Sequence, residues 1–123
     1  MGGRPLVAVV DDDESVRESL PDLLKEFGFA ARAFSSAEEF LASDSIGKTK
    51  CLVLDIALPG MSGPELQQEL TRRRQKIPIV FITGHASEPE PLHLIQGGAV
   101  ALLHKPFSDI ALLKSLNKAL GLG

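Results

Sequence analysis

The chain lacks several features that would assign it to a special class of protein. It has one cysteine, Cys51, so no intrachain disulfide can form, and the apolar segment around Cys51 predicts a buried, unreactive thiol. Its apolar runs are far shorter than the roughly 18 residues of a membrane-spanning helix. The N-terminal MGGRP lacks the apolar core of a signal peptide. These absences favour the cytoplasm as the compartment and argue against a membrane location.

Clusters of basic residues are also scarce. The chain has 13 Lys and Arg against 16 Asp and Glu, with a formal net charge of −3. Nucleic-acid binding depends on clustered cations that contact phosphates, so this composition argues against direct nucleic-acid binding. The one tight basic run, residues 72–74, falls where a helix should end, and cations there interact favourably with the helix dipole. A polyanion site is the less favoured alternative for this run.

What the sequence does contain is a regular series of short apolar runs. Its 123 residues, of which 44% are hydrophobic, suit one domain with a proper core. The runs VAVVD, CLVLD, IVFIT and VALLH are nearly uninterrupted, as is typical of parallel strands buried on both faces of a sheet. We therefore expect a single domain over residues 1–123, with its core at about 6–120.

Helical patterns alternate with the apolar runs. Gly28 suits a C-terminal cap, and Ser36 with Glu39 and Ser62 with Glu65 fit capping boxes. The expected helices cover residues 16–27, 36–43 and 62–74, a short segment ending at Gln96, and a last helix capped by Ser108, on which Ile110, Leu113, Leu116 and Leu120 share one face. The runs IVFIT and VALLH correspond to strands at 79–83 and 99–104, and one further, weaker strand is expected at 30–34. The alternation predicts an α/β fold of five βα units with right-handed crossovers.

Four residues able to do chemistry stand at the ends of the apolar runs: Asp11, Asp55, Thr83 and Lys105. In open α/β sheets, ligands bind outside the carboxyl ends of the strands, so these side chains should meet there. Two carboxylates, a hydroxyl and an ammonium suit a divalent cation together with a phosphoryl group.

These segments resemble the receiver domain of two-component response regulators. VVDDDESVRESL, CLVLDIALPGMSGPEL, IPIVFITG and GAVALLHKPF stand in that family's order and spacing, from about Leu6 to Leu120. FITGH and GAV…KPF are most similar to receivers that precede helix-turn-helix output domains. The resemblance implies a flavodoxin-like (βα)5 doubly wound sheet with strand order 2-1-3-4-5. It also implies that Asp55 accepts a phosphoryl group from a histidine kinase or a histidine phosphotransfer protein.

The run of three aspartates allows two interpretations. Crowded carboxylates are tolerable only if they are protonated or held around a cation, and Mg²⁺ prefers oxygen ligands. The resemblance implies that Asp12 and Asp55 bind Mg²⁺ directly, Asp11 through water, and Ala57 through its backbone carbonyl. Aspartates also cap helix N-termini, which is the alternative for the run and the expected role of Asp13.

The remaining site residues have ordinary alternatives too. Asp55 could simply end a strand, Thr83 could be a β-branched strand residue, and Lys105 could be a solvated surface lysine. The resemblance instead implies that Thr83 and Lys105 bind phosphoryl oxygens, and that the peptide before Pro106 is cis.

The sequence departs from the family pattern at three places. Leu102 replaces the Tyr or Phe usual three residues before the lysine, which puts the aromatic switch in doubt. Pro21 lies inside the first expected helix, where a kink is predicted. Pro89 and Pro91 fall where the fourth helix usually begins and should shorten it. The histidines have no metal-ligand spacing, although the position of His85 predicts that it overhangs the phosphorylation site; the others are His93 and His104.

The sequence therefore predicts a phosphorylation-dependent switch, not a turnover enzyme, with only weak self-catalysed phosphotransfer and dephosphorylation. The expected readout is a face formed by helix four, strand five and helix five, acting on an output domain or partner protein; phosphorylation-dependent dimerisation is left open. The alternative is a docking module that works without phosphorylation. A haloacid dehalogenase-type phosphatase is rejected, because it would need an aspartate at Ala57.

Overall fold

The fold is built on one parallel sheet of five strands. The computed structural model describes residues 3–84 and 98–122. The strands are β1 (Leu6–Val10), β2 (Ala30–Phe34), β3 (Thr49–Asp55), β4 (Ile79–Thr83) and β5 (Ala101–His104). Their order in the sheet is β2-β1-β3-β4-β5, all parallel, which confirms the predicted flavodoxin-like arrangement. The predicted short helix ending at Gln96 lies outside the described residues, as do Pro89, Pro91, His85 and His93.

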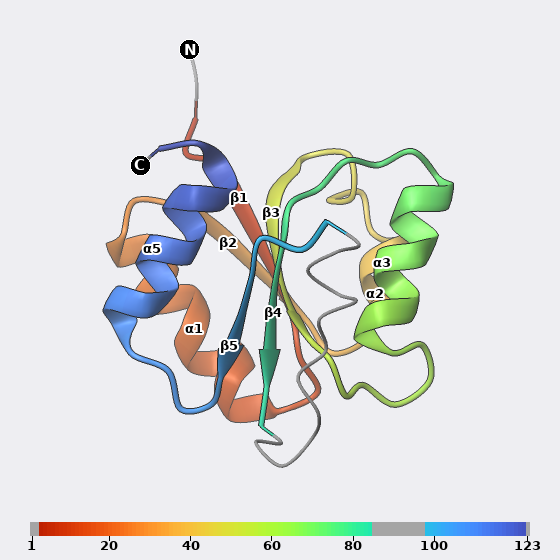
Figure 1. Ribbon diagram of the computed structural model, residues 1–123, viewed down its shortest axis with the longest axis horizontal. Coiled ribbons are helices and arrows are strands. Elements are labelled where there is room, and N and C mark those ends of the chain that lie inside the picture. The colour runs from red at the N-terminus through yellow and green to blue at the C-terminus, as the bar shows by residue number, and fades with distance from the viewer. Residues whose placement is uncertain (1–2, 85–97, 123) are drawn as a thin grey trace.

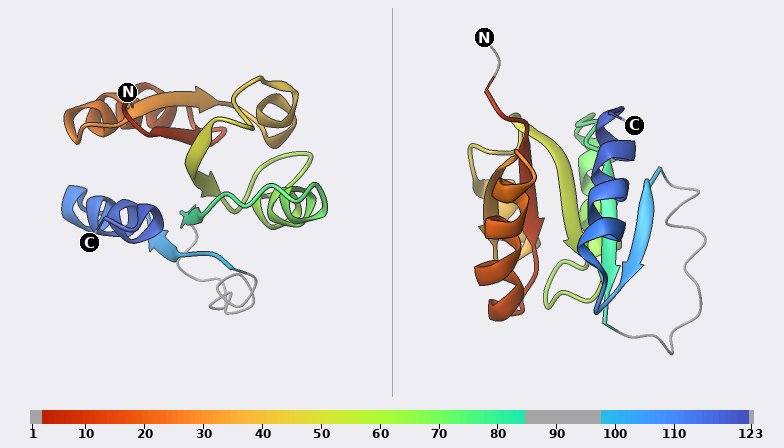
Figure 2. Two further views of the ribbon diagram at one scale, coloured as in Figure 1. Left: turned by 90° about the horizontal axis from the view of Figure 1, so that it is seen from above. Right: turned by 90° about the vertical axis from the view of Figure 1, so that its left-hand side faces the viewer.

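The described helices cover both faces of this sheet. Helices α1 (Glu14–Glu26) and α5 (Asp109–Leu120) lie on one face, and α2 (Ala37–Ala42) and α3 (Gly63–Arg72) lie on the other (Figures 1 and 2). None of the helices in the described part of the chain has the length and apolarity needed to cross a bilayer.

The sheet separates two hydrophobic cores, because alternate residues of each strand point to opposite faces. Val9, Val53 and Ile82 pack with Leu24 of α1 and Leu116 of α5. On the opposite face, the core contains Val10, Leu54 and Phe81 together with Phe40 of α2 and Leu66 of α3. This two-sided burial explains why the strands appear in the sequence as nearly uninterrupted apolar runs.

Cys51 belongs to the core beneath α1 and α5 and is fully buried. Burial raises the pKa of its thiol to about 12. The thiolate is the reactive form of cysteine, so a thiol that stays protonated in a packed core is inert, as predicted.

The helix termini follow the local sequence closely. Asp13 caps α1, and Gly28, with φ of 97°, ends it in a Schellman motif, in which Phe29 N–H donates to Leu24 O at 3.0 Å. The reciprocal capping box predicted for α3 is present, and Ser108 caps α5. Pro21 lies within α1, which continues through it.

Two helix predictions need correction at the level of single residues. Ser36 accepts the N–H of Glu39, as expected, but the Glu39 carboxylate accepts from Ser35 N at 2.6 Å, so the predicted capping box of α2 is not reciprocal. On α5, Ile110 was expected on the buried face but is 67% exposed. It stands in the first turn, whereas Leu112 and Leu116, one turn apart, are the side chains that enter the core.

Helix α3 ends at Arg72, two residues earlier than predicted. Arg73 is its C-cap, and Arg74 adopts a left-handed conformation with φ of 60°. Arg72 and Arg73 contact the Glu69 carboxylate at 2.5 and 2.6 Å. These two guanidinium groups lower the pKa of Glu69 to about 2. Two of the three arginines of the basic run thus pair with their own helix, which favours the structural interpretation over a polyanion site.

The N-terminus of α3 packs directly on the end of β3. Gly63 N–H donates to Ile56 O at 3.0 Å. A Cβ atom on Gly63 would overlap the backbone oxygen of Asp55 and lie 3.0 Å from Ile56 Cα. Both neighbours are backbone atoms, which cannot move aside as a flexible side chain could. Glycine is therefore required at this position by close approach.

We predict that Gly63→Ala lowers the free energy of unfolding by about 1–3 kcal/mol, because the added methyl group must displace the end of β3. Urea unfolding followed by far-UV circular dichroism measures the change. Gly47→Ala is the matched control, since no heavy atom beyond its own chain neighbours lies within 4 Å of the methyl group it adds. Equal stability of Gly63→Ala and Gly47→Ala would show that the contact with β3 is not restrictive.

Candidate functional site

The four polar residues predicted to meet do lie at one edge of the sheet. Asp11 directly follows β1, and its N–H extends the pairing with β2 by donating to Phe34 O at 3.1 Å. Asp55 and Thr83 are the last residues of β3 and β4, and both are buried. Lys105 follows β5, and its N–H donates to Thr83 O at 2.7 Å. Parallel strand ends thus bring together residues that are far apart in sequence.

Three carboxylates crowd this edge. Asp11, Asp12 and Asp55 each offer an oxygen, and these oxygens lie within 4.8 Å of one another. Asp11 is completely buried and Asp55 is 6% exposed, whereas Asp12 faces solvent. Like charges at such distances repel unless a proton or a cation compensates for them.

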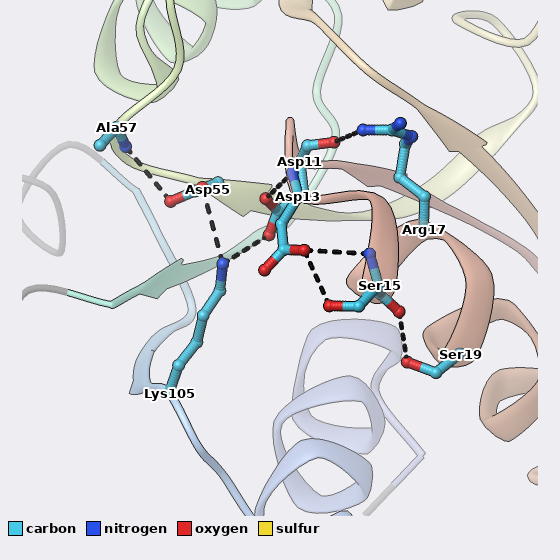
Figure 3. A network of polar contacts seen from close by, with 8 residues as sticks. All are labelled: Asp11, Asp13, Ser15, Arg17, Ser19, Asp55, Ala57 and Lys105. Carbon is cyan, nitrogen blue, oxygen red and sulfur yellow. Dashed lines mark hydrogen bonds and ion pairs between the residues drawn. The ribbon is translucent and has the colours of Figure 1, made fainter.

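Asp13 is not part of this cluster. Its Oδ1 accepts from Ser15 N at 2.9 Å and from Ser15 Oγ at 2.8 Å, so it is the N-cap of α1 (Figure 3). The Ser15 hydroxyl and N–H hold the pKa of Asp13 below its usual value. The aspartate run therefore contains a helix cap as well as members of the acidic cluster.

Lys105 places a positive charge beside the buried acids. Its Nζ lies 2.8 Å from Asp11 Oδ2 and 3.7 Å from Asp55 Oδ2, with the side chain 23% exposed (Figure 3). Burial alone would lower the pKa of Lys105, but the hydrogen bond to Asp11 and the charge of Asp55 outweigh it, and the pKa is raised. The ammonium therefore stays charged between the two acids. The Lys105–Pro106 peptide bond is cis, as the resemblance implied.

Asp55 is an unusually basic carboxylate. Its pKa is raised from 3.8 to about 6, first by burial and then by the charge of Asp11. Lys105 and the N–H of Ala57, which donates to Asp55 Oδ1 at 3.2 Å, oppose this shift without cancelling it. Asp55 is therefore mostly ionised at neutral pH, but at a cost in free energy that a further cation would reduce.

The residues at this edge fit a magnesium ion. Asp11 Oδ1 accepts from Asp13 N at 2.9 Å, whereas the buried Oδ2 has, among the described residues, no partner besides the Lys105 ammonium at 2.8 Å. A buried oxygen with unused lone pairs beside two other carboxylates is the type of ligand that Mg²⁺ prefers. For Ala57 the structure gives only the N–H contact with Asp55, so its carbonyl as a ligand remains a prediction.

Two residues that support the site were not found from sequence. Arg17 Nη1 donates to the backbone oxygen of Asp11 at 3.1 Å and ties the first turns of α1 to the acidic loop (Figure 3). Its spacing from Asp11 within VVDDDESVR could have suggested this contact. Glu38 on α2 accepts from Met61 N at 2.9 Å, in the loop after Asp55. No local pattern signals a contact between residues 23 positions apart.

The raised pKa of Asp55 predicts a pH-dependent stability. At about pH 4 the Asp55 carboxylate of the folded domain is largely protonated, so its burial costs little. Between about pH 4 and pH 6 Asp55 is ionised in the unfolded chain but still protonated in the folded domain, so the domain loses stability as the pH rises. Above pH 6 the full loss of folding free energy is present. Asp55→Asn should therefore stabilise the metal-free domain by about 1 kcal/mol at neutral pH, after allowance for screening by solvent. This gain should shrink as the pH falls toward 4.

Urea unfolding of both proteins across this pH range, without divalent cations, provides the measurement. Asp22→Asn, which changes an exposed aspartate on α1, is the control for a generic loss of charge. A stability difference between Asp55→Asn and wild type that does not change with pH would contradict the prediction.

Comparison with known proteins is consistent with this geometry. The family model described as "Response regulator receiver domain" matches residues 7–117. Nodulation protein W of Bradyrhizobium diazoefficiens is 47% identical over 113 residues, which cover 92% of this chain and 50% of that protein. Transcriptional regulatory protein FixJ of Azorhizobium caulinodans is 38% identical over 115 residues, covering 94% and 54%. The chain thus spans about half the length of these curated relatives.

Solved structures show the same architecture. The response regulator StyR superposes with a TM-score of 0.89 at 46% identity, covering 98% of this chain and 61% of that one. The structure titled FixJ-N gives a TM-score of 0.85 at 36% identity, covering 98% and 96%. With the sheet order, the acidic edge and the family match in agreement, the chain belongs to the response regulator receiver domains of two-component systems.

Proposed function

We propose that this receiver domain is a phosphorylation-dependent switch in which Asp55 is the phosphoacceptor. The observation that carries the proposal is the position of Asp55, at the end of a buried strand and between the charges of Asp11 and Lys105. A histidine kinase or a histidine phosphotransfer protein would supply the phosphoryl group.

In the transfer, an Asp55 carboxylate oxygen attacks phosphorus while the bond from phosphorus to the donor's histidine nitrogen breaks. Its raised pKa makes Asp55 a better nucleophile than an ordinary carboxylate, while leaving most of it ionised at neutral pH. Asp11, Asp12 and Asp55, with the Ala57 carbonyl, would hold Mg²⁺. When bound, Mg²⁺ supplies positive charge that stabilises the phosphoryl oxygens.

Lys105 and Thr83 would receive the new group. The Lys105 ammonium lies 3.7 Å from Asp55 Oδ2 and can pair with a phosphoryl oxygen as a point charge. Thr83 ends the neighbouring strand, and its hydroxyl would bond another oxygen. Phosphorylation adds about −1.5 to −2 units of charge, and movement of these two residues toward it would bias the predicted face of helix four, β5 and α5, mainly through the loop after Thr83 and helix four.

The output is expected to lie outside the described domain. Because a relative is named a transcriptional regulatory protein and this chain matches about half of it, we infer that phosphorylation controls an attached output domain or a separate partner. This role is one of signalling, with only weak self-catalysed phosphotransfer and dephosphorylation. Dimerisation on phosphorylation would be one way to transmit the change.

The first test is direct phosphorylation by a small donor. Incubated with phosphoramidate or acetyl phosphate and Mg²⁺, the wild-type domain should gain one phosphoryl group by intact mass, whereas Asp55→Asn should gain none. Asp44→Asn, which changes an exposed aspartate in the loop after α2, is the control and should be labelled like wild type. Equal labelling of Asp55→Asn and wild type would exclude Asp55, and failure to label wild type would favour the docking alternative.

Asp12 tests the role of the cation separately. Asp12 is exposed, so Asp12→Ala should leave the fold intact while abolishing Mg²⁺-dependent labelling. Labelling is measured with and without Mg²⁺, and folding by circular dichroism. If Asp12→Ala is labelled at the wild-type rate with the same Mg²⁺ dependence, Asp12 is not a ligand.

Leu102 allows a test of how the signal leaves the site. It pairs in register with Phe81 and is partly buried against the core beneath α2 and α3, so we infer that it is a passive packing residue. Leu102→Tyr should then leave phosphorylation unchanged. Amide chemical shifts with and without a phosphoryl mimic should change most over residues 84–98 and little around Leu102. The largest changes at Leu102 and α5 would show that leucine performs the switching role of the usual aromatic.

A further inference from the structure

The loop between β3 and α3 is held at its start by the adjacent strand β4 and at its end by the first turn of α3. At its start, Ile56 N–H donates to Ile82 O at 3.0 Å, and Leu58 is buried in the core beneath α2 and α3. At its end, Ser62 N–H donates to Glu65 Oε1 at 2.9 Å within the capping box of α3. The segment between, Pro59 to Met61, carries the turn.

One side chain from outside this βα unit holds the turn. Glu38, in the first turn of α2, reaches across and accepts the Met61 N–H at 2.9 Å through Oε2. This N–H, which holds the pKa of Glu38 below its usual value, stabilises the ionised carboxylate. Glu38 is exposed, so its side chain is not fixed there by burial.

Gly60 makes room for the same carboxylate. Its φ of 74° is a conformation that favours glycine, and a Cβ atom there would lie 2.7 Å from Glu38 Oε2. The Glu38 carboxylate therefore lies against the bare Cα of Gly60 while it binds the next N–H. The Met61 N–H and the missing side chain of Gly60 therefore both accommodate the Glu38 carboxylate.

The position of Ala57 depends on this turn. Ala57 lies between Asp55, to which its N–H donates at 3.2 Å, and the turn that Glu38 holds. Met61 directly precedes Ser62, so the Glu38 contact fixes the turn just before the second anchor of the loop. Without this contact, we expect the turn from Pro59 to Met61 to depend on its anchors at Leu58 and Ser62.

We propose that Glu38 is a positioning residue for the phosphorylation site, holding the β3–α3 loop so that the Ala57 carbonyl faces the acidic cluster. The inference rests on the proposed Mg²⁺ site. It assigns α2 a part in cation binding, although α2 supplies no ligand. Residues that orient ligands without touching the metal often change affinity about 10-fold or more. Because Glu38 is exposed and water competes for its contacts, we expect about a 3- to 10-fold effect.

The test compares Mg²⁺ dissociation constants of wild type, Glu38→Gln, Glu38→Asp and Glu38→Ala, from amide shifts at residues flanking Asp11 and Asp55. Glutamine keeps the length and an accepting oxygen, so Glu38→Gln should bind Mg²⁺ within about 2-fold of wild type. Aspartate keeps the charge but is one methylene too short, so Glu38→Asp should weaken binding as Glu38→Ala does. The Met61 amide resonance should move further in the two weakened variants than in Glu38→Gln.

Glu39→Ala is the matched control. It removes a carboxylate from the same turn of α2, but the Glu39 carboxylate accepts from Ser35 and, among the described residues, makes no hydrogen bond to the loop. Its Mg²⁺ affinity should equal that of wild type, and thermal unfolding establishes that all variants are folded.

Wild-type Mg²⁺ affinity in both Glu38→Asp and Glu38→Ala would overturn the proposal. So would a loss in Glu38→Gln with none in Glu38→Asp, since the charge of Glu38 would then act and not its reach. If wild type itself shows no Mg²⁺-dependent shifts, the proposed cation site fails as well. If wild type binds Mg²⁺ and the Glu38 variants bind it equally well, the cation site stands and only the role of Glu38 fails.

Discussion

The chemistry of this domain depends on two buried carboxylates that share one ammonium. Asp11 and Asp55 lose the hydration that an exposed carboxylate has, and Lys105, at 2.8 and 3.7 Å, compensates for only part of the negative charge. The pKa of Asp55, about 6, expresses this imbalance. This excess of negative charge is what the proposed cation and the proposed phosphoryl transfer to Asp55 both require.

The parallel sheet makes this arrangement possible. Strands buried on both faces can place a charged side chain only where they end, and the order β2-β1-β3-β4-β5 puts the ends of β1, β3 and β4 side by side. Two residues fit the adjoining helices to the site. Arg17 of α1 binds the backbone oxygen of Asp11, and Gly63 allows the start of α3 to approach Asp55 closely. The helices thus support the site without supplying its reactive groups.

The sequence predicted most of the fold because the controlling signals are local or periodic. β2 and β4 lie at the predicted residues, and the capping serines of α3 and α5 begin those helices. The meeting of Asp11, Asp55 and Lys105 was also predictable, since parallel strands align their carboxyl ends. What the sequence could not supply depends on side-chain direction and on long-range contacts. Ile110 has the right spacing but points to solvent, and the contact from Glu38 to Met61 joins residues that no local pattern relates.

The inert thiol of Cys51 has a practical consequence for spectroscopy. It is the only cysteine, it is fully buried, and its pKa of about 12 keeps it protonated. A cysteine engineered on any exposed helix would therefore be the single site to react with a maleimide dye or a spin label. The chain also contains no tryptophan or tyrosine, so one introduced tryptophan would supply its entire indole fluorescence. Motion at the acidic edge can thus be followed with one introduced probe at a time, without labelling of a native thiol and without native tryptophan or tyrosine fluorescence.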